Sequence, residues 1–221
     1  MQVPPSSGVP TIAIDRLSQD EREDAWMCLR CLHHIESRCE DFRSALKLFD
    51  FAWRIVAVDQ QMVKPHTKLI QSWQLIAARD GAMSIYHFAK AMDGANTWAF
   101  RHKIIGDKVD KTLLRKSFKQ LQQSFPRLAA MRHSIAHSTE LIKNPDWYKD
   151  HAFTGSYDRH GIQLDNAKNF MATNVLSGNT FISTFENEII EYEISQNSLD
   201  QLIEIRTLFF SAFSGLENNS P

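Results

Sequence analysis

Residues 66–92 read HTKLIQSWQLIAARDGAMSIYHFAKAM, and they indicate the fold class most directly. Apolar side chains recur there at three- and four-residue spacing, with Leu69, Trp73 and Phe88 among them. This spacing places the apolar side chains on one face of a helix, so the stretch predicts a long amphipathic helix. An Asp-Gly pair at 93–94 follows and predicts the helix end.

Helical patterns also occupy both flanks of this stretch. A capping box at Ser18-Gln-Asp-Glu21 predicts a helix that continues to about residue 35, and a second helix is expected over 41–59. Residues 108–141 predict a further helical region, interrupted near Pro126 because proline disfavours helix at the residue before it. A last helix is expected from Ser198 onward.

The character of the sequence changes after residue 145. Residues 172–176 and 180–185 are strand-like and flank a Ser-Gly-Asn turn, which predicts a hairpin. Residues 189–194, IIEYEI, alternate as a half-buried third strand would. The sequence thus predicts a mainly α protein. A single helical domain covers 17–214, with an antiparallel β insertion at about 150–195 before the C-terminal helix and flexible tails at 1–16 and 215–221.

Composition excludes several classes of protein. Of the 221 residues, 43% are apolar and 23% are charged, which is ordinary for a globular chain and argues against general disorder. No apolar run approaches the roughly 20 residues of a membrane span, and the N-terminus lacks the pattern of a secretory signal. Three cysteines cannot all pair within the chain. We therefore expect a cytoplasmic protein that does not bind membranes.

Positive charge is concentrated in one region although the formal net charge is −1. Between residues 101 and 132 there are nine lysines and arginines against two aspartates. Such a region would steer a polyanion toward the protein, whereas the alternative is a solvated helix face. The candidates to follow an RNA backbone are Lys111, Arg115, Lys116 and Lys119.

Two further groups of polar residues lie within predicted helices. Cys28 and Cys31, with histidines at 33–34, suggest a zinc site, but their spacing also suits small buried side chains. Arg79 and Asp80 precede two small residues in an apolar helix. They indicate polar groups at a cleft or subunit interface, or alternatively a salt bridge or a helix-packing site.

Residues 131–138 read MRHSIAHS and end the basic region. Cleavage of RNA without a metal needs a group that removes the proton of the ribose 2′-hydroxyl, and the neutral imidazole of His137 could accept it. It also needs a cation for the charge that develops on the phosphate oxygens, as the Arg132 guanidinium would provide. On an ideal helix these two residues point about 140° apart. A shared phosphate would then require the long arginine side chain, a local distortion or a second copy of the chain.

The phrase Arg132-His133-x-x-x-His137 resembles the RxxxxH signature of the HEPN superfamily, and the predicted helical bundle resembles the HEPN fold. The likeness covers residues 17–141 and the last helix, and it is closest to abortive-infection-type proteins. It implies an up-and-down bundle and a metal-independent endoribonuclease without cofactors, acting as a homodimer whose two motifs line one cleft. The products would carry a 2′,3′-cyclic phosphate.

The resemblance also implies roles for individual residues. His137 would be the general base or acid, Arg132 the phosphate clamp and His133 an orienting group, with Arg79 and Asp80 supporting the cleft. A role as a toxin or phage-defence effector follows, with an antitoxin protein as a possible partner. The sequence does not identify the RNA target, the cleavage specificity, the trigger or the role of the β insertion.

Three alternatives remain for this motif. His133, His137 and Glu140 share one helix face and would offer three metal ligands. A structural helix end would use the same side chains to bind carbonyl groups. The family also contains non-catalytic modules that bind RNA or protein, or that serve in assembly.

Aromatic residues beyond the motif allow two interpretations. Trp147, Tyr148 and Tyr157, with Arg159 and His160, would stack on unpaired bases. The alternative is that they fix a loop against the bundle.

Overall fold

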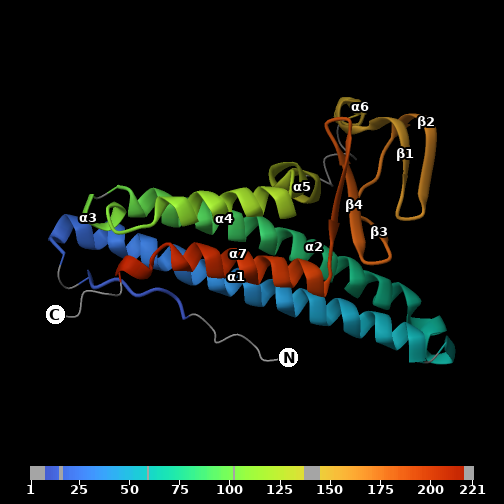
Figure 1. Cartoon of the computed structure of the whole chain (residues 1–221). Helices are drawn as coiled ribbons and strands as arrows, with labels where there is room; N and C mark the ends of the chain where they lie inside the picture. The colour runs from blue at the N-terminus through green and yellow to red at the C-terminus, as the bar shows by residue number, and fades with distance from the viewer. Residues whose placement is uncertain (1–7, 15–16, 59, 102, 137–144, 217–221) are drawn as a thin grey trace. The chain divides into compact units, whose positions relative to one another are not determined.

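The structure is a computed structural model that describes residues 8–14, 17–58, 60–101, 103–136 and 145–216 (Figure 1). It is mainly helical with small antiparallel sheets near the C-terminus, as the sequence predicts. The chain forms two compact units: residues 1–40, 87–126 and 199–221 belong to the first, and residues 41–86 and 127–198 to the second. None of the described helices has an apolar stretch that could cross a membrane.

The helices are α1 (Gln19–Val58), α2 (Gln60–Ala99), α3 (Lys103–Gly106), α4 (Lys111–Ser124), α5 (Leu128–Ala136), α6 (Pro145–His151) and α7 (Gln196–Ser211). The strands are β1 (Phe153–Arg159), β2 (Ile162–Phe170), β3 (Val175–Ser177), β4 (Thr180–Phe185) and β5 (Glu188–Glu193). Strands β1 and β2 form one sheet, and β3, β4 and β5 form another in that order.

Helix α1 is a single helix of 40 residues where the sequence predicts two. Residues 36–40 contain neither glycine nor proline. Cys39 continues the buried stripe between Ile35 and Phe42, so no break is needed there. The predicted helix end near residue 35 is therefore wrong.

Helix α2 continues past Asp93 and Gly94, and the predicted stop at this pair is also wrong. A Cβ atom at position 94 would lie 2.8 Å from the Sγ atom of Cys31 on α1. Glycine at position 94 therefore allows α1 and α2 to approach each other closely here. The buried residues Ala95 and Ala99 extend the same packing face.

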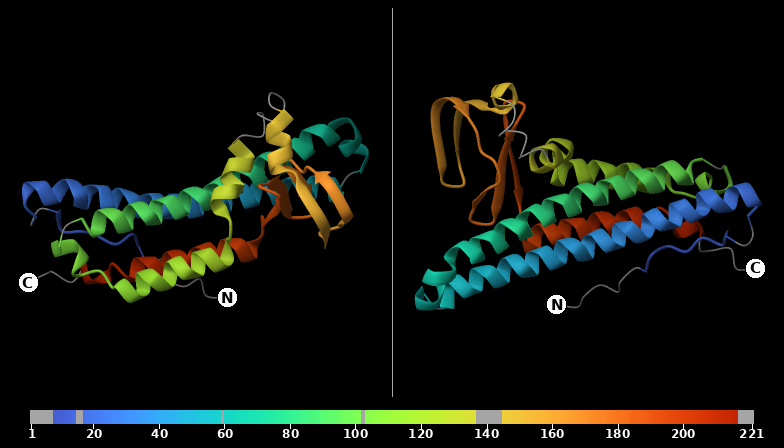
Figure 2. Two further views of the ribbon diagram at one scale, coloured as in Figure 1. Left: turned by 90° about the horizontal axis from the view of Figure 1, so that it is seen from above. Right: turned by 180° about the vertical axis from the view of Figure 1, so that it is seen from behind.

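Within the first unit, α4 lies beside α7 (Figures 1 and 2). The rings of Phe118 and Phe209 meet edge to face with centroids 5.9 Å apart, and the Gln120 amide donates to Glu204 at 2.9 Å. Helix α7 is also joined to α1, because both terminal oxygens of Glu36 lie 2.9 Å from Nη1 of Arg206. Arg206 is buried and the Glu36 side chain is 33% exposed, so this pair is partly shielded from solvent.

The interruption near Pro126 is confirmed. Helix α4 ends at Ser124 and α5 begins at Leu128, with Arg127 at a positive φ of 62° between them. The predicted continuation to residue 141 runs into 137–144, which lie outside the described residues.

The hairpin predicted over 172–185 and the third strand after it are confirmed as β3, β4 and β5. The β1–β2 hairpin is missing from the prediction. Its turn has positive φ at His160 and Gly161, and its second strand bulges where Asn166 and Asn169 also have positive φ. These bulges break the polar-apolar alternation by which a strand is recognised in sequence.

Strand β5 is fixed to α2 by Tyr192, whose hydroxyl donates to the carbonyl oxygen of Ala78. A Cβ atom at position 81 would lie 2.9 Å from this hydroxyl, so Gly81 makes room for it. Tyr192 is 6% exposed, and burial raises the pKa of its hydroxyl, with a smaller contribution from the nearby carboxylate of Asp80. The small residues after Arg79 and Asp80 thus serve packing.

We predict that Tyr192→Phe lowers the free energy of unfolding by about 1 kcal/mol at neutral pH, because it removes one buried hydrogen bond. Above about pH 10 the unfolded chain releases the tyrosine proton while the folded protein keeps it, so the wild type loses stability there. The difference in free energy of unfolding between the wild type and Tyr192→Phe should therefore shrink as the pH rises above about 10. Urea unfolding at several pH values measures it, and a constant difference would contradict the assignment.

Candidate functional site

Helix α5 presents Arg132 and His133 near the end of its described length. Its buried face consists of Ala130, Met131, Ser134 and Ile135. Arg132 is half-buried and His133 is exposed, because they lie between the buried positions. The helix therefore holds two polar side chains of the predicted motif at the surface of the second unit.

The guanidinium of Arg132 lies beside the imidazole of His133, with Nη1 3.4 Å from Nδ1. A guanidinium only donates hydrogen bonds, so Nδ1 must accept in this contact. The contact places the guanidinium at the edge of the exposed ring.

Phe185, at the end of β4, lies under two histidine rings. Its ring is nearly parallel to His133, with centroids 5.7 Å apart, and to His151 at 4.3 Å. His151 also accepts a hydrogen bond at Nδ1 from the backbone N–H of Glu186 at 3.1 Å. The sequence does not indicate His151 as part of the site, because no spacing rule connects α6 to α5. Only the strand between them brings the two imidazoles to one aromatic ring.

An ion pair connects the start of α5 to β5. Arg127 meets both carboxylate oxygens of Glu188, at 2.8 and 2.6 Å. Both side chains are about half exposed, at 46% and 49%, so the pair adds little stability. Its two-point geometry nevertheless fixes the orientation of the helix start relative to the strand.

His137 lies outside the described residues, so the structure gives no distance between the two ends of the predicted motif. The structure also gives no geometry for the metal-binding alternative, because two of its three ligands, His137 and Glu140, lie outside the described residues. Among the residues that the structure describes, no group of three or more metal-ligating side chains occurs.

Arg79 and Asp80 lie exposed on α2, in the same unit as α5. The carboxylate of Asp80 lies near enough to Tyr192 to raise the pKa of its hydroxyl, and Arg132 contacts His133. The support of Arg132 by Asp80 therefore remains a prediction.

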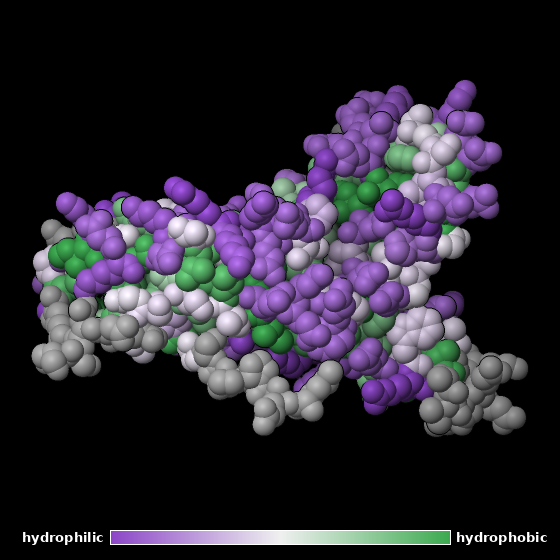
Figure 3. All heavy atoms as spheres, viewed as in Figure 1, coloured by the Kyte–Doolittle hydropathy of each residue, from purple (hydrophilic) through white to green (hydrophobic). Residues whose placement is uncertain are grey.

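The four basic residues of α4 are all exposed, and this helix contains no acidic residue. They are Lys111, Arg115, Lys116 and Lys119. Figure 3 shows hydrophilic side chains over α4. The aspartate at 110 is used as the N-cap, where Oδ1 accepts from the backbone of Thr112 and Leu113. Helix α4 therefore presents a basic face with no acidic residue of its own, but it belongs to the first unit and α5 to the second.

The cysteines favour packing over zinc binding. Cys28 and Cys39 are buried, and the Cys28 thiol donates to the carbonyl oxygen of Ala95 at 3.6 Å. Burial raises the pKa of the Cys28 thiol to about 12. A metal ligand must be a thiolate, so this environment opposes metal binding.

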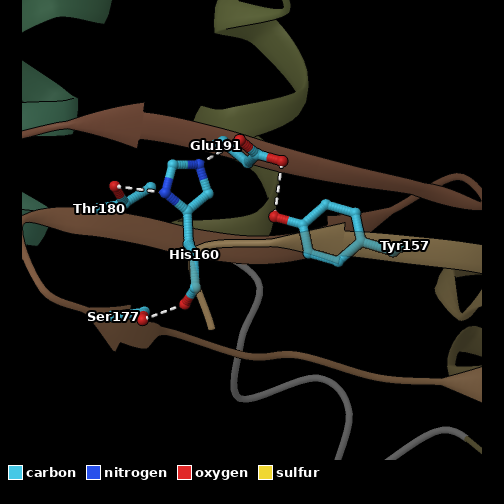
Figure 4. A network of polar contacts seen from close by, with 5 residues as sticks. All are labelled: Tyr157, His160, Ser177, Thr180 and Glu191. Atoms are coloured by element: carbon cyan, nitrogen blue, oxygen red, sulfur yellow. Dashed lines mark hydrogen bonds and ion pairs between the residues drawn. The ribbon is translucent and has the colours of Figure 1, made fainter. Parts of the chain in front are cut away.

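A polar network joins the β1–β2 hairpin to the second sheet (Figure 4). Glu191 of β5 accepts from the hydroxyl of Tyr157 at 2.7 Å and lies 2.9 Å from Nε2 of His160. Nδ1 of the same ring is 3.3 Å from the Thr180 hydroxyl, and the Ser177 hydroxyl donates to the backbone carbonyl of His160. Burial, then the bond to Glu191, raises the pKa of Tyr157. Tyr157 and His160 thus tie the two sheets together.

The chain matches no family model, and neither a curated protein nor a solved structure matches it.

We expect Glu191→Ala to lower the free energy of unfolding by about 1–2 kcal/mol, because the half-buried Tyr157 and His160 side chains lose a common partner. Glu193→Ala on the same strand is the matched control, since Glu193 is exposed, and its effect should stay within about 0.5 kcal/mol. Urea unfolding measures both. Equal losses in the two variants would show that the network contributes nothing of its own.

Proposed function

We propose that the protein is a metal-independent endoribonuclease of HEPN type that acts as a homodimer. The observation that carries this proposal is the contact of Arg132 with the His133 ring on the exposed side of α5, five residues before His137. Arg132 supplies a phosphate-binding cation, and His133 supplies an imidazole beside it. A toxin or phage-defence role rests on the resemblance alone.

The chemistry is a transfer of phosphate from the 5′ oxygen to the 2′ oxygen. His137 removes the proton of the 2′-hydroxyl, and the resulting oxygen attacks the phosphorus atom. The bond between phosphorus and the 5′ oxygen breaks, a proton returns to that oxygen, and a 2′,3′-cyclic phosphate remains. Arg132 binds the non-bridging oxygens as they gain charge. His133 orients the arginine through the contact between them.

The basic face of α4 supports a polyanionic substrate. Lys111, Arg115, Lys116 and Lys119 would contact RNA phosphates without reading the sequence. Each phosphate contact releases a counterion, so binding would depend strongly on salt. Arg79 and Asp80 on α2 would support the cleft.

The first test is cleavage of mixed cellular RNA in EDTA. Arg132→Ala should slow cleavage by about 100- to 1,000-fold, because one transition-state contact is lost. His137→Ala should slow it by about 100- to 10,000-fold, through loss of proton transfer. His34→Ala, an exposed histidine of α1, is the control and should keep full activity.

Both catalytic variants must first be shown to be folded by circular dichroism. Cleavage that needs an added divalent metal would contradict the proposal. RNA binding without cleavage by the wild type would instead favour a non-catalytic HEPN-like module.

A second test concerns the basic face. Replacing the four α4 cations by glutamine should weaken binding of single-stranded RNA and reduce the slope of log K against log salt by about 0.7 for each phosphate contact removed. Fluorescence anisotropy at several salt concentrations measures this slope. Lys47→Gln, an exposed lysine of α1, should leave it unchanged. An unchanged slope in the fourfold variant would remove α4 from the RNA path.

A further inference from the structure

A pocket of about 310 Å³ lies in the second unit, between α1, α2 and β3 with the residues that flank it. Trp53 of α1 supplies an aromatic ring. The side-chain amides of Gln71, Gln74 and Asn174 supply polar groups, and Leu75 and Leu176 add apolar surface. Neither Arg132 nor His133 is among the residues that line it.

The chemistry of this lining is selective. None of the described residues that line the pocket carries a charge. Phosphates, carboxylates and cations are therefore disfavoured, because a desolvated charge needs an opposite partner. Each amide offers both a hydrogen-bond donor and an acceptor, and the indole offers a flat π surface. A neutral, planar ligand with donors and acceptors on its edge fits this set.

Asn174 gives the pocket an unsatisfied group. Its Oδ1 atom is buried and has no hydrogen-bonding partner among the residues that the structure describes. Its backbone has φ of 55°, a left-handed conformation that asparagine tolerates better than most residues. An amide oxygen left unpaired in this way is costly, and a turn of the Asn174 side chain toward the pocket would let a ligand N–H satisfy it.

Trp53 is fixed but accessible. Its ring meets the buried Phe49 edge to face, with centroids 6.3 Å apart and an angle of 68° between the planes. The residue is nevertheless 43% exposed. An exposed aromatic ring that lines a polar pocket is the kind of surface on which proteins stack unpaired bases.

We propose that this pocket binds one unpaired nucleobase, which stacks on Trp53 and donates an N–H to Oδ1 of Asn174. Gln71 and Gln74 read the rest of its edge. The inference rests on the proposed function only in taking RNA as the source of the base, since a free nucleoside has the same chemistry. A base held here would anchor a single strand by an interaction that does not depend on phosphate charge.

The test uses the full chain and a labelled single-stranded oligonucleotide with 2′-O-methyl riboses, which cannot be cleaved through the 2′ oxygen. Anisotropy gives the dissociation constant. Trp53→Leu should weaken binding by about 5- to 150-fold, the loss expected for one stacked base. Trp26→Leu is the matched control, because Trp26 is also an exposed tryptophan of α1, and it should bind as the wild type does.

Asn174→Gly removes the amide and keeps the left-handed backbone accessible, so it should weaken binding about fivefold or more. The duplex of the same sequence should show no effect of Trp53→Leu, because its bases are paired. Competition with free nucleosides tests whether a nucleoside alone can occupy the pocket. Displacement of the labelled strand by millimolar nucleoside would support a base-binding pocket. Binding of nucleosides but not of the strand would replace RNA by a free nucleoside as the ligand.

Equal binding by wild type and Trp53→Leu would overturn the proposal, as would an equal loss in Trp26→Leu or no binding of strand and nucleosides. These outcomes are separate from the cleavage proposal, because the oligonucleotide is not cleavable. A protein that cleaves RNA but binds equally well without Trp53 retains the nuclease and loses the pocket. A protein that binds RNA through Trp53 but never cleaves it would retain the pocket proposal and lose the nuclease proposal.

Discussion

The hydroxyl of Tyr192 donates to the backbone of α2 at Ala78, and the sheet of the second unit is fixed to its helices through this contact. The approach is possible only because position 81 is glycine. A larger side chain there would meet Tyr192 and, at 3.5 Å, both Phe42 and Ile194. One small residue in a long helix therefore determines where β5 lies, and β4 follows through its hydrogen bonds to β5.

The position of β4 in turn determines the chemistry that the second unit presents. Phe185 ends this strand, and the rings of His133 and His151 both lie parallel to it. Helix α5 packs on β4, so Arg132 and His133 reach the surface beside the strand end. The β insertion, which lies outside the HEPN resemblance, thus supplies the aromatic ring against which His133 and His151 pack.

The sequence predicted those features that depend on local spacing, such as the apolar stripes of α1 and α2, the break at Pro126 and the hairpin at 177–180. It failed where tertiary contacts override local signals. Gly94 indicates a helix stop in the sequence but makes room for Cys31, whereas the close approach of Tyr192 to Gly81 fits the packing alternative that the sequence left open. The β1–β2 hairpin was missed because bulges at Asn166 and Asn169 disturb its alternation. His151 and the Trp53–Asn174 pocket join residues far apart in the chain, which no spacing rule relates.

The most direct test of the proposed nuclease is to incubate the protein with a defined RNA oligonucleotide in EDTA and to measure the masses of the fragments. We expect a 2′,3′-cyclic phosphate on the upstream fragment and a 5′-hydroxyl on the downstream fragment. The same strand with 2′-O-methyl riboses should remain intact, because its 2′ oxygen has no proton to lose. Cleavage of the methylated strand, or fragments that end in a 3′-hydroxyl and a 5′-phosphate, would show that water and not the ribose attacks the phosphorus. That result would contradict the role assigned to His137.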